Sequence, residues 1–412
     1  MSHFTVMVIG DNVDEQMAPY HEFECTGDDN EYVQDIDKTE EARKEYEKDT
    51  TTMVKSPSGK IQSRFTKKGN YKKRFLREPT EEEQKEHGKF FGSGGNGKLQ
   101  WTSNDYGDGK GYRSLIVELP KGWTEVEVKT SDYESFATWI EGYYGHKPVK
   151  YGQKPNIKTT HKYGYTILDK KGNVVKTVDR TNPNRKWDGY MVGGRCNGFF
   201  KLKEAALAAG AGTVGQPSWG MEPAPKGYAD QAHKGEIDIE GMRLDAGNKA
   251  AAKYDRFHDI LAKNPGYVPF KVILAKHEAA LALPPEPESI DELDNEPESL
   301  ADLREKALEA ARSEYRSQPA QQAINADEEF RWMWDGYDEF FVTREECIQA
   351  ARDRAFTTFA LLKDGEWYEK GRMGWFALVS NEKVQGDWNK EFNSIIDGLS
   401  DDTLLTVCDC HI

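Results

Sequence analysis

The sequence has little of what a membrane or secreted protein needs. Its longest apolar stretches fall far short of the roughly 20 residues of a membrane-spanning helix. The cysteines are few, odd in number, without the spacing of a disulfide framework and not preceded by a signal peptide; they are Cys25, Cys196, Cys347, Cys408 and Cys410. These absences predict reduced thiols and a soluble protein of the cytoplasm.

Positive charge is also scarce. Lysine and arginine number 56 against 71 aspartates and glutamates, which gives a net charge of −15. General nucleic-acid binding is therefore not expected, because that affinity comes from clustered lysine and arginine. The best local exception, from Lys67 to Arg74, is explained more simply as a solvated basic loop. With 37% hydrophobic and 11% aromatic residues, the composition is that of an ordered globular protein.

The pattern of short strands, turns and helices predicts an α+β fold, in which helices cover a mainly antiparallel sheet. The clearest hairpin turns are Lys171-Gly172-Asn173 and Asp364-Gly365. Strands at 112–119 and 124–129 predict another hairpin around Pro120-Lys121-Gly122. We expect the N-terminal strand, residues 5–9, to share a sheet with the C-terminal strands.

The length of 412 residues suggests two or three domains. An acidic, proline-rich stretch at 284–299 is the clearest linker. It separates an N-terminal and central α+β region, 1–283, with a long elaborated middle, from a C-terminal α+β region, 300–412.

The segment from Lys186 to Phe200 carries the most distinctive chemistry. Gly193-Gly194 permits positive φ and exposed amides that can cradle an anion. Arg195 would clamp a phosphate or carboxylate, while Trp187 or Tyr190 stacks on a flat ring. These five residues form the predicted ligand-binding site. The alternative is a tight turn wedged between aromatic core residues, with Arg195 paired to an acid such as Asp188.

Two acidic strings suggest weaker metal sites. Glu127 lies on a predicted strand and, with Asp105 or Asp108 upstream, has the outline of a Mg²⁺-dependent nuclease centre. Glu236, Asp238 and Glu240 would share one face of another predicted strand and offer hard oxygen ligands. Solvated strand faces account for both strings more simply. We therefore assign no cofactor, and Mg²⁺ belongs only to the alternative in which the protein is an enzyme.

Two further patterns fail as chemical motifs. The run from Gly92 to Lys98 has the spacing of a phosphate-binding loop, but Leu99 stands where a serine or threonine must hold Mg²⁺. The terminal Cys408-Asp409-Cys410-His411 lacks the second ligand pair of a zinc site, so its cysteines are expected to be buried on a strand.

Five segments resemble a widespread family of uncharacterised bacteriophage and prophage proteins. The family pattern begins with HFTVxVIGD and QxAPYHEFECTG, continues with KWDWYxxGGRWxGFFKLK, and ends with GWxxxVSxEK and DDTLLTVxDCHI. The matching segments are His3–Asp11, Gln16–Gly27, Lys186–Lys203, Gly374–Lys383 and Asp401–Ile412. The resemblance spans nearly the whole chain.

This resemblance implies a viral protein acting in the cytoplasm of an infected bacterium, but it implies no established activity. Where the family has two tryptophans in its central element, this chain has Gly189 and Cys196. Either the ligand differs from that of the relatives, or those tryptophans are core residues.

The leading hypothesis is a phage-encoded accessory protein that binds or sequesters a host factor, such as a defence protein, or a small anionic ligand. One alternative is a metal-dependent enzyme acting on nucleic acid or nucleotides. Another is a virion assembly protein.

Overall fold

The computed structural model describes residues 2–66, 70–83, 101–105, 112–284, 298–331, 333, 337–374 and 378–412. Asp108, the run 92–98 and most of the predicted linker lie outside these residues. The linker therefore remains a prediction. The fold is α+β, and none of the described helices is both long and apolar enough to cross a membrane.

The chain forms two compact units, of which unit 1 comprises residues 1–22 and 184–412 and unit 2 residues 23–183. The predicted regions 1–283 and 300–412 thus both contribute to unit 1.

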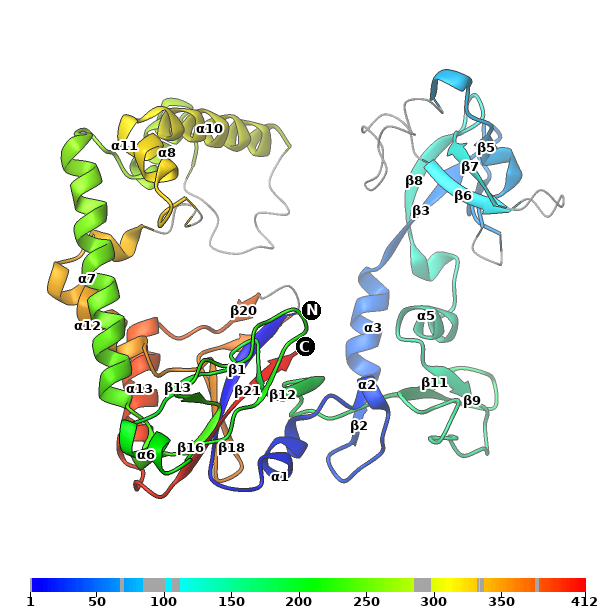
Figure 1. Cartoon of the computed structure of the whole chain (residues 1–412). Helices are drawn as coiled ribbons and strands as arrows, with labels where there is room; N and C mark the ends of the chain where they lie inside the picture. Colours follow the sequence, from blue (N-terminus) through cyan, green and yellow to red (C-terminus); the bar gives the residue numbers. More distant parts are fainter. Residues whose placement is uncertain are drawn as a thin grey trace. The chain divides into compact units, whose positions relative to one another are not determined.

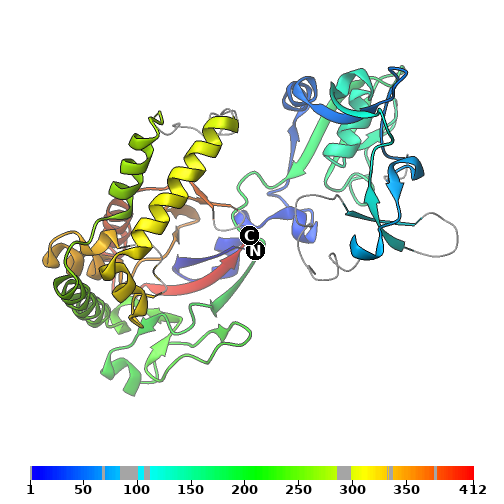
Figure 2. The same ribbon diagram turned by 90° about the horizontal axis from the view of Figure 1, so that it is seen from above.

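A seven-stranded mixed sheet organises the described part of unit 1, in the order β14-β12-β21-β1-β17-β18, with β16 also paired to β21. The strands are β1 (His3–Ile9), β12 (Gly189–Gly194), β14 (Gln216–Pro217), β16 (Gln231–His233), β17 (Ala360–Lys363), β18 (Glu366–Glu369) and β21 (Leu404–His411). β1 and β21 pair antiparallel from His3↔His411 to Ile9↔Leu405, which confirms that the N-terminal and C-terminal strands share a sheet. Figure 2 shows them side by side, with both termini at one end.

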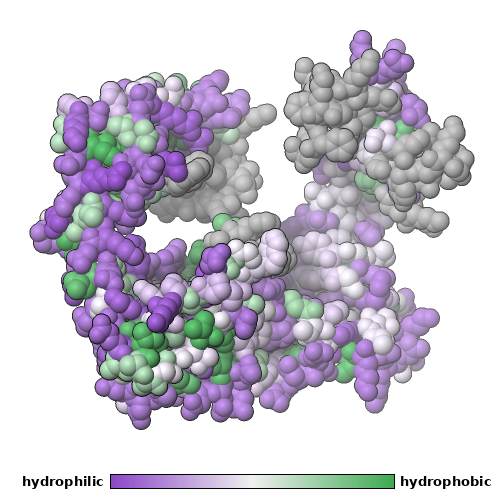
Figure 3. Space-filling model, in the orientation of Figure 1, coloured by the Kyte–Doolittle hydropathy of each residue, from purple (hydrophilic) through white to green (hydrophobic). Residues whose placement is uncertain are grey.

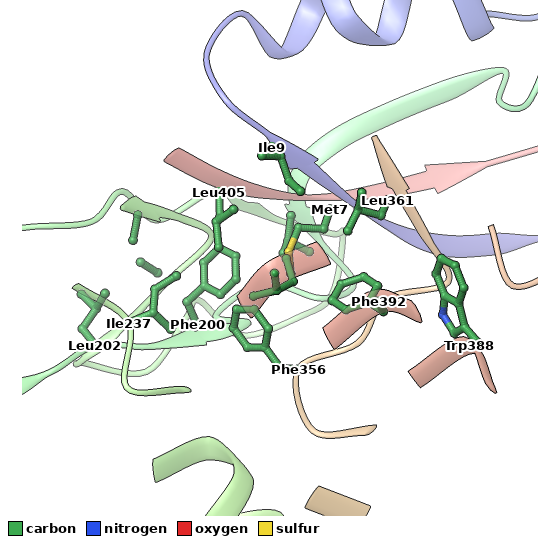
Figure 4. Packing of buried hydrophobic residues seen from close by; sticks show 14 residues of the cluster. Met7, Ile9, Phe200, Leu202, Ile237, Phe356, Leu361, Trp388, Phe392 and Leu405 are labelled. Carbon is green, nitrogen blue, oxygen red and sulfur yellow. The ribbon is translucent and has the colours of Figure 1, made fainter. Parts of the chain in front are cut away.

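The main core lies on one face of this sheet. Alternate residues of β1 and β21, such as Met7 and Leu405, belong to one buried cluster with Trp388 and Phe392 of α13 (Gln385–Asp397), all labelled in Figure 4. The opposite face buries Phe4, Val6 and Val8 with Trp187 and the two C-terminal cysteines. Cys408 and Cys410 are thus buried on a strand, as predicted.

Helices complete unit 1 (Figure 1). The longest, α7 (Ile239–Lys263), packs on α12 (Arg344–Arg354). The other described helices are α1 (Val13–Met17), η1 (Ala18–Tyr20), α6 (Glu204–Ala208), η4 (Lys234–Glu236), α8 (Phe270–Ala280), α10 (Glu298–Ser317), α11 (Pro319–Ala326) and η5 (Asp338–Phe340). Short strand pairs join β13 (Phe200–Lys201) to β15 (Tyr228–Ala229) and β19 (Arg372–Met373) to β20 (Val379–Ser380).

The described part of unit 2 contains three small sheets. They are built from β2 (Gln34–Asp37), β3 (Thr50–Lys55), β4 (Ile61–Gln62), β5 (Leu76–Arg77), β6 (Trp101–Asp105), β7 (Tyr112–Val117), β8 (Thr124–Lys129), β9 (Lys147–Val149), β10 (Gly164–Leu168) and β11 (Val174–Thr181). The helices described in this unit are α2 (Phe23–Thr26), α3 (Thr39–Lys48), η2 (Lys73–Phe75), η3 (Thr130–Asp132) and α5 (Phe136–Tyr143).

One predicted hairpin of unit 2 is confirmed and one is wrong. β10 and β11 pair across the turn at Gly172. In contrast, β7 pairs with β5 and β6, whereas β8 pairs with β3. The turn from Pro120 to Trp123 does form, closed by a 3.0 Å backbone hydrogen bond, but it carries the chain from one sheet to another.

Candidate functional site

The predicted glycine turn directly follows the pairing of β12 with β21. Gly193 and Gly194 have φ of +86° and +58°, so the expected positive φ is present at both. A Cβ on Gly194 would lie 2.3 Å from the Cβ of Asp409. Glycine is therefore required here by backbone conformation and by the close approach of β21.

The amides beyond this turn already hold anions, but these are the protein's own carboxylates. The Arg195 amide donates to Asp409 Oδ2 at 2.8 Å. Asp230, which is fully buried, accepts from the amides of Gly198 at 2.6 Å and Gly215 at 2.8 Å, one on each oxygen. These amides are consequently engaged within the fold and not offered to an external anion.

The two aromatic residues of the predicted site belong to the interior. Trp187 is 7% exposed, and its ring lies 4.7 Å from His21 and 5.0 Å from Tyr190. The Tyr190 hydroxyl donates to Asp14, and burial, followed by this bond, raises the Tyr190 pKa. Stacking of Trp187 on an external ring would require it to leave the core.

The two positions that differ from the phage family are also internal. A Cβ at Gly189 would lie 2.8 Å from His411 Nε2, so the glycine makes room for this imidazole, which pairs with Asp188. Cys196 is half-buried against the main core, and burial raises its pKa to about 11.

Arg195 remains as the exposed functional group of the predicted site. Its side chain is exposed, and among the described residues no carboxylate lies within ion-pair distance of its guanidinium. The alternative partner considered from sequence, Asp188, instead pairs with His411. The sequence thus placed the arginine correctly on a glycine turn, but not its aromatic neighbours.

The structure adds a neighbour that the sequence did not single out. Trp219 is 101% exposed, whereas large aromatic side chains are ordinarily at least partly covered. It occupies the second position of a turn closed by a 3.0 Å bond from the Met221 amide to the Ser218 carbonyl. Gly220 has φ of +80° at the third position, as a type II turn requires.

This turn is tethered to the central element. The Ser218 amide donates to the Gly194 carbonyl at 3.1 Å, and β14, just before it, pairs with β12. The Ser218 hydroxyl lies 3.9 Å from the sulfur of Met191 and 3.5 Å from the same Asp409 oxygen that holds the Arg195 amide. Arg195, Met191 and the tryptophan turn therefore lie together on unit 1.

Two methionines at or beside the turn are exposed. Met191 is 41% and Met221 46% exposed. Figure 3 shows further hydrophobic side chains gathered over β13, β16 and α6 on one face of unit 1. In the sequence, Trp219 lies within a glycine- and proline-rich loop, residues 215–227. A tryptophan in such a loop is the pattern that could have indicated this exposed surface.

The predicted metal ligands serve structural roles where they are described. Glu127 lies on the exposed face of β8 and accepts a hydrogen bond from Thr52. The predicted strand at 236–240 is wrong, because Asp238 caps α7 through the Gly241 amide. Glu236 belongs to a capping box with His233, and Glu240 pairs with Arg243 at 2.8 Å.

Comparison with known proteins adds no assignment: no family model, curated protein or solved structure matches the chain.

Proposed function

We propose that the protein is a phage-encoded accessory protein that binds a host protein in the cytoplasm of an infected bacterium. The contact is made by Met191, Arg195, Trp219 and Met221, which we call the Trp219 surface. The observation that carries the proposal is the complete exposure of Trp219 on a tethered turn.

The composition of this surface supports a protein contact. Tryptophan, methionine and arginine are enriched at the centres of protein interfaces, and tryptophan and arginine dominate the binding free energy. An indole that is left wholly in water gains free energy when a partner buries it. Because the turn is pinned to β12, little chain entropy is lost when the indole is buried.

The shape and charge of the surface define the partner. Small-molecule sites are concave, whereas Trp219 projects fully into solvent. The partner is therefore a protein with an apolar pocket that receives the indole. Acidic side chains at the rim of that pocket would pair with Arg195, because a guanidinium binds carboxylates in a bidentate manner.

Capture from lysate of infected bacteria, followed by mass spectrometry and a measured Kd, tests the proposal. Trp219→Ala is expected to weaken the interaction by about 30-fold or more, which is the scale of an interface hot spot. Arg195→Ala should weaken it less and reduce its salt dependence. Tyr143→Ala is the matched control, because Tyr143 is an exposed aromatic residue of unit 2. Equal capture by Trp219→Ala and Tyr143→Ala would refute the proposal.

A further inference from the structure

A second feature of unit 1 is a cavity of about 170 Å³ that shares no residue with the Trp219 surface. It lies where the segment before β12 meets β1, β18 and β19. Its wall is aromatic, formed by Phe4, Phe359 and Trp367, and three cations line it: Arg185, Lys186 and Arg372.

The aromatic wall is held in place by defined contacts. The Phe4 ring meets those of Phe359 and Trp367 edge-on, at 5.6 and 6.4 Å. Trp367 also lies 5.0 Å from Tyr20, whose hydroxyl donates to the Gly365 carbonyl at 2.7 Å. The wall is therefore formed before any ligand arrives.

Glu369 fixes two of the lining residues. One of its oxygens accepts from the Trp367 indole at 2.8 Å, and the other accepts from the Lys186 ammonium at 2.7 Å. An ammonium has three donors, so Lys186 keeps further N–H groups for a ligand. Glu369 thus positions the lysine and the indole at once.

The side-chain charges of the cavity favour an anion. Glu22 and Glu369 are its two acids, against three cations. Lys186 pairs with Glu369, and the Arg185 Nε lies 3.6 Å from Glu22. Arg372 is exposed, and no described carboxylate lies within ion-pair distance of it. Among the lining side chains, one cation, Arg372, therefore has no acidic partner beside the aromatic wall.

We propose that this cavity binds the phosphate group of a small phosphate compound. The Arg372 guanidinium clamps two phosphate oxygens, and Lys186 donates to a third, since arginine gives bidentate geometry and lysine a point charge. The volume admits a phosphate and little more, so any attached base or sugar extends along the Trp367 wall and outward. The phosphate belongs either to free inorganic phosphate or to a nucleoside monophosphate.

Isothermal titration calorimetry of the full chain at low salt, with inorganic phosphate and separately with adenosine monophosphate, tests this site. Saturable binding of at least one compound is expected, with a loss of tenfold or more in Arg372→Ala and partial retention in Arg372→Lys. Tighter binding of the nucleotide identifies it as the source of the phosphate, whereas equal affinities identify free phosphate.

The controls separate the site from general charge effects. Arg312→Ala removes an exposed arginine of α10 and should leave the affinity unchanged. Trp367→Phe keeps the wall but removes the indole donor to Glu369, and should weaken binding several-fold. Absence of binding by the wild-type protein, or equal affinity of Arg372→Ala and Arg312→Ala, would overturn the proposal. Circular dichroism of each variant confirms that the fold is intact.

Discussion

At the scale of single residues, buried carboxylates explain why the central element looks like an anion site in sequence. Positive-φ glycines and clustered amides occur here as expected, but Asp230 and Asp409 supply the anions internally. The residue types alone show that amides converge on a negative charge. They do not show whether that charge is a ligand or a side chain distant in sequence.

Asp230→Ala should strongly destabilise the protein. Asp230 is fully buried and accepts from the amides of Gly198, Phe199 and Gly215. Its removal leaves three partly buried amide donors without this acceptor, at about 1–3 kcal/mol for each donor that stays unsatisfied. We expect the free energy of unfolding in urea to fall by roughly 3 kcal/mol or more. Asp302→Ala, at an exposed position of α10, should change it by less than about 0.5 kcal/mol.

Thiol labelling of the native protein at pH 8 should modify Cys25 rapidly and the other four cysteines slowly. Cys25 is exposed, whereas burial raises the pKa of Cys196 to about 11 and that of Cys408 to about 12. Burial also raises the pKa of Cys347 and Cys410. A higher pKa lowers the thiolate fraction at pH 8, and the thiolate is the reactive form. Rapid labelling of more than one thiol before denaturation would contradict this assignment.

At the scale of elements, the sequence predicts best where local chemistry decides. The Asp364-Gly365 hairpin forms because both residues adopt positive φ, at 53° and 77°. Which strands pair is harder to predict, because pairing depends on segments that are distant in the sequence. Thus β7 and β8 were located correctly but paired wrongly. At 236–240, helix capping by Asp238 prevailed over an alternating pattern typical of a strand.

The close packing of β12 on β21 gives a test at this scale. Gly194→Ala combines a positive φ with a Cβ position 2.3 Å from Asp409, whereas Gly266 has φ of +93° and open space around it. Gly266→Ala should therefore cost only the backbone strain, roughly 1–2 kcal/mol. Gly194→Ala should cost clearly more and displace Asp409. The free energy of unfolding of both variants is measured in urea. Similar losses in the two variants would show that β12 and β21 leave room for the added methyl group.

At the scale of the whole molecule, unit 2 is an insertion into unit 1. The chain leaves unit 1 after residue 22 and returns at 184. Within unit 1 these two ends are close, because the Glu22 amide donates to the Trp187 carbonyl at 2.7 Å. The boundaries of this insertion were not predicted, because neither carries a proline-rich stretch like the one at 284–299.

Replacement of residues 23–183 by a short glycine–serine linker should leave unit 1 folded. The core of unit 1 and the Trp219 surface lie outside the deleted segment. Partner capture by the shortened chain should match that of the full chain. Cooperative unfolding monitored by circular dichroism, together with the same capture assay, checks this prediction. An unfolded product would show that unit 1 requires unit 2.

The most direct test of the proposed function places a photo-crosslinking amino acid at position 219 of the intact protein during infection. Position 143, an exposed tyrosine of unit 2 at 63% exposure, serves as the reference. Irradiation is predicted to give one dominant covalent adduct with a host protein from position 219 and none from position 143. No adduct at 219, or the same adducts from both positions, would contradict a partner-binding role for the Trp219 surface.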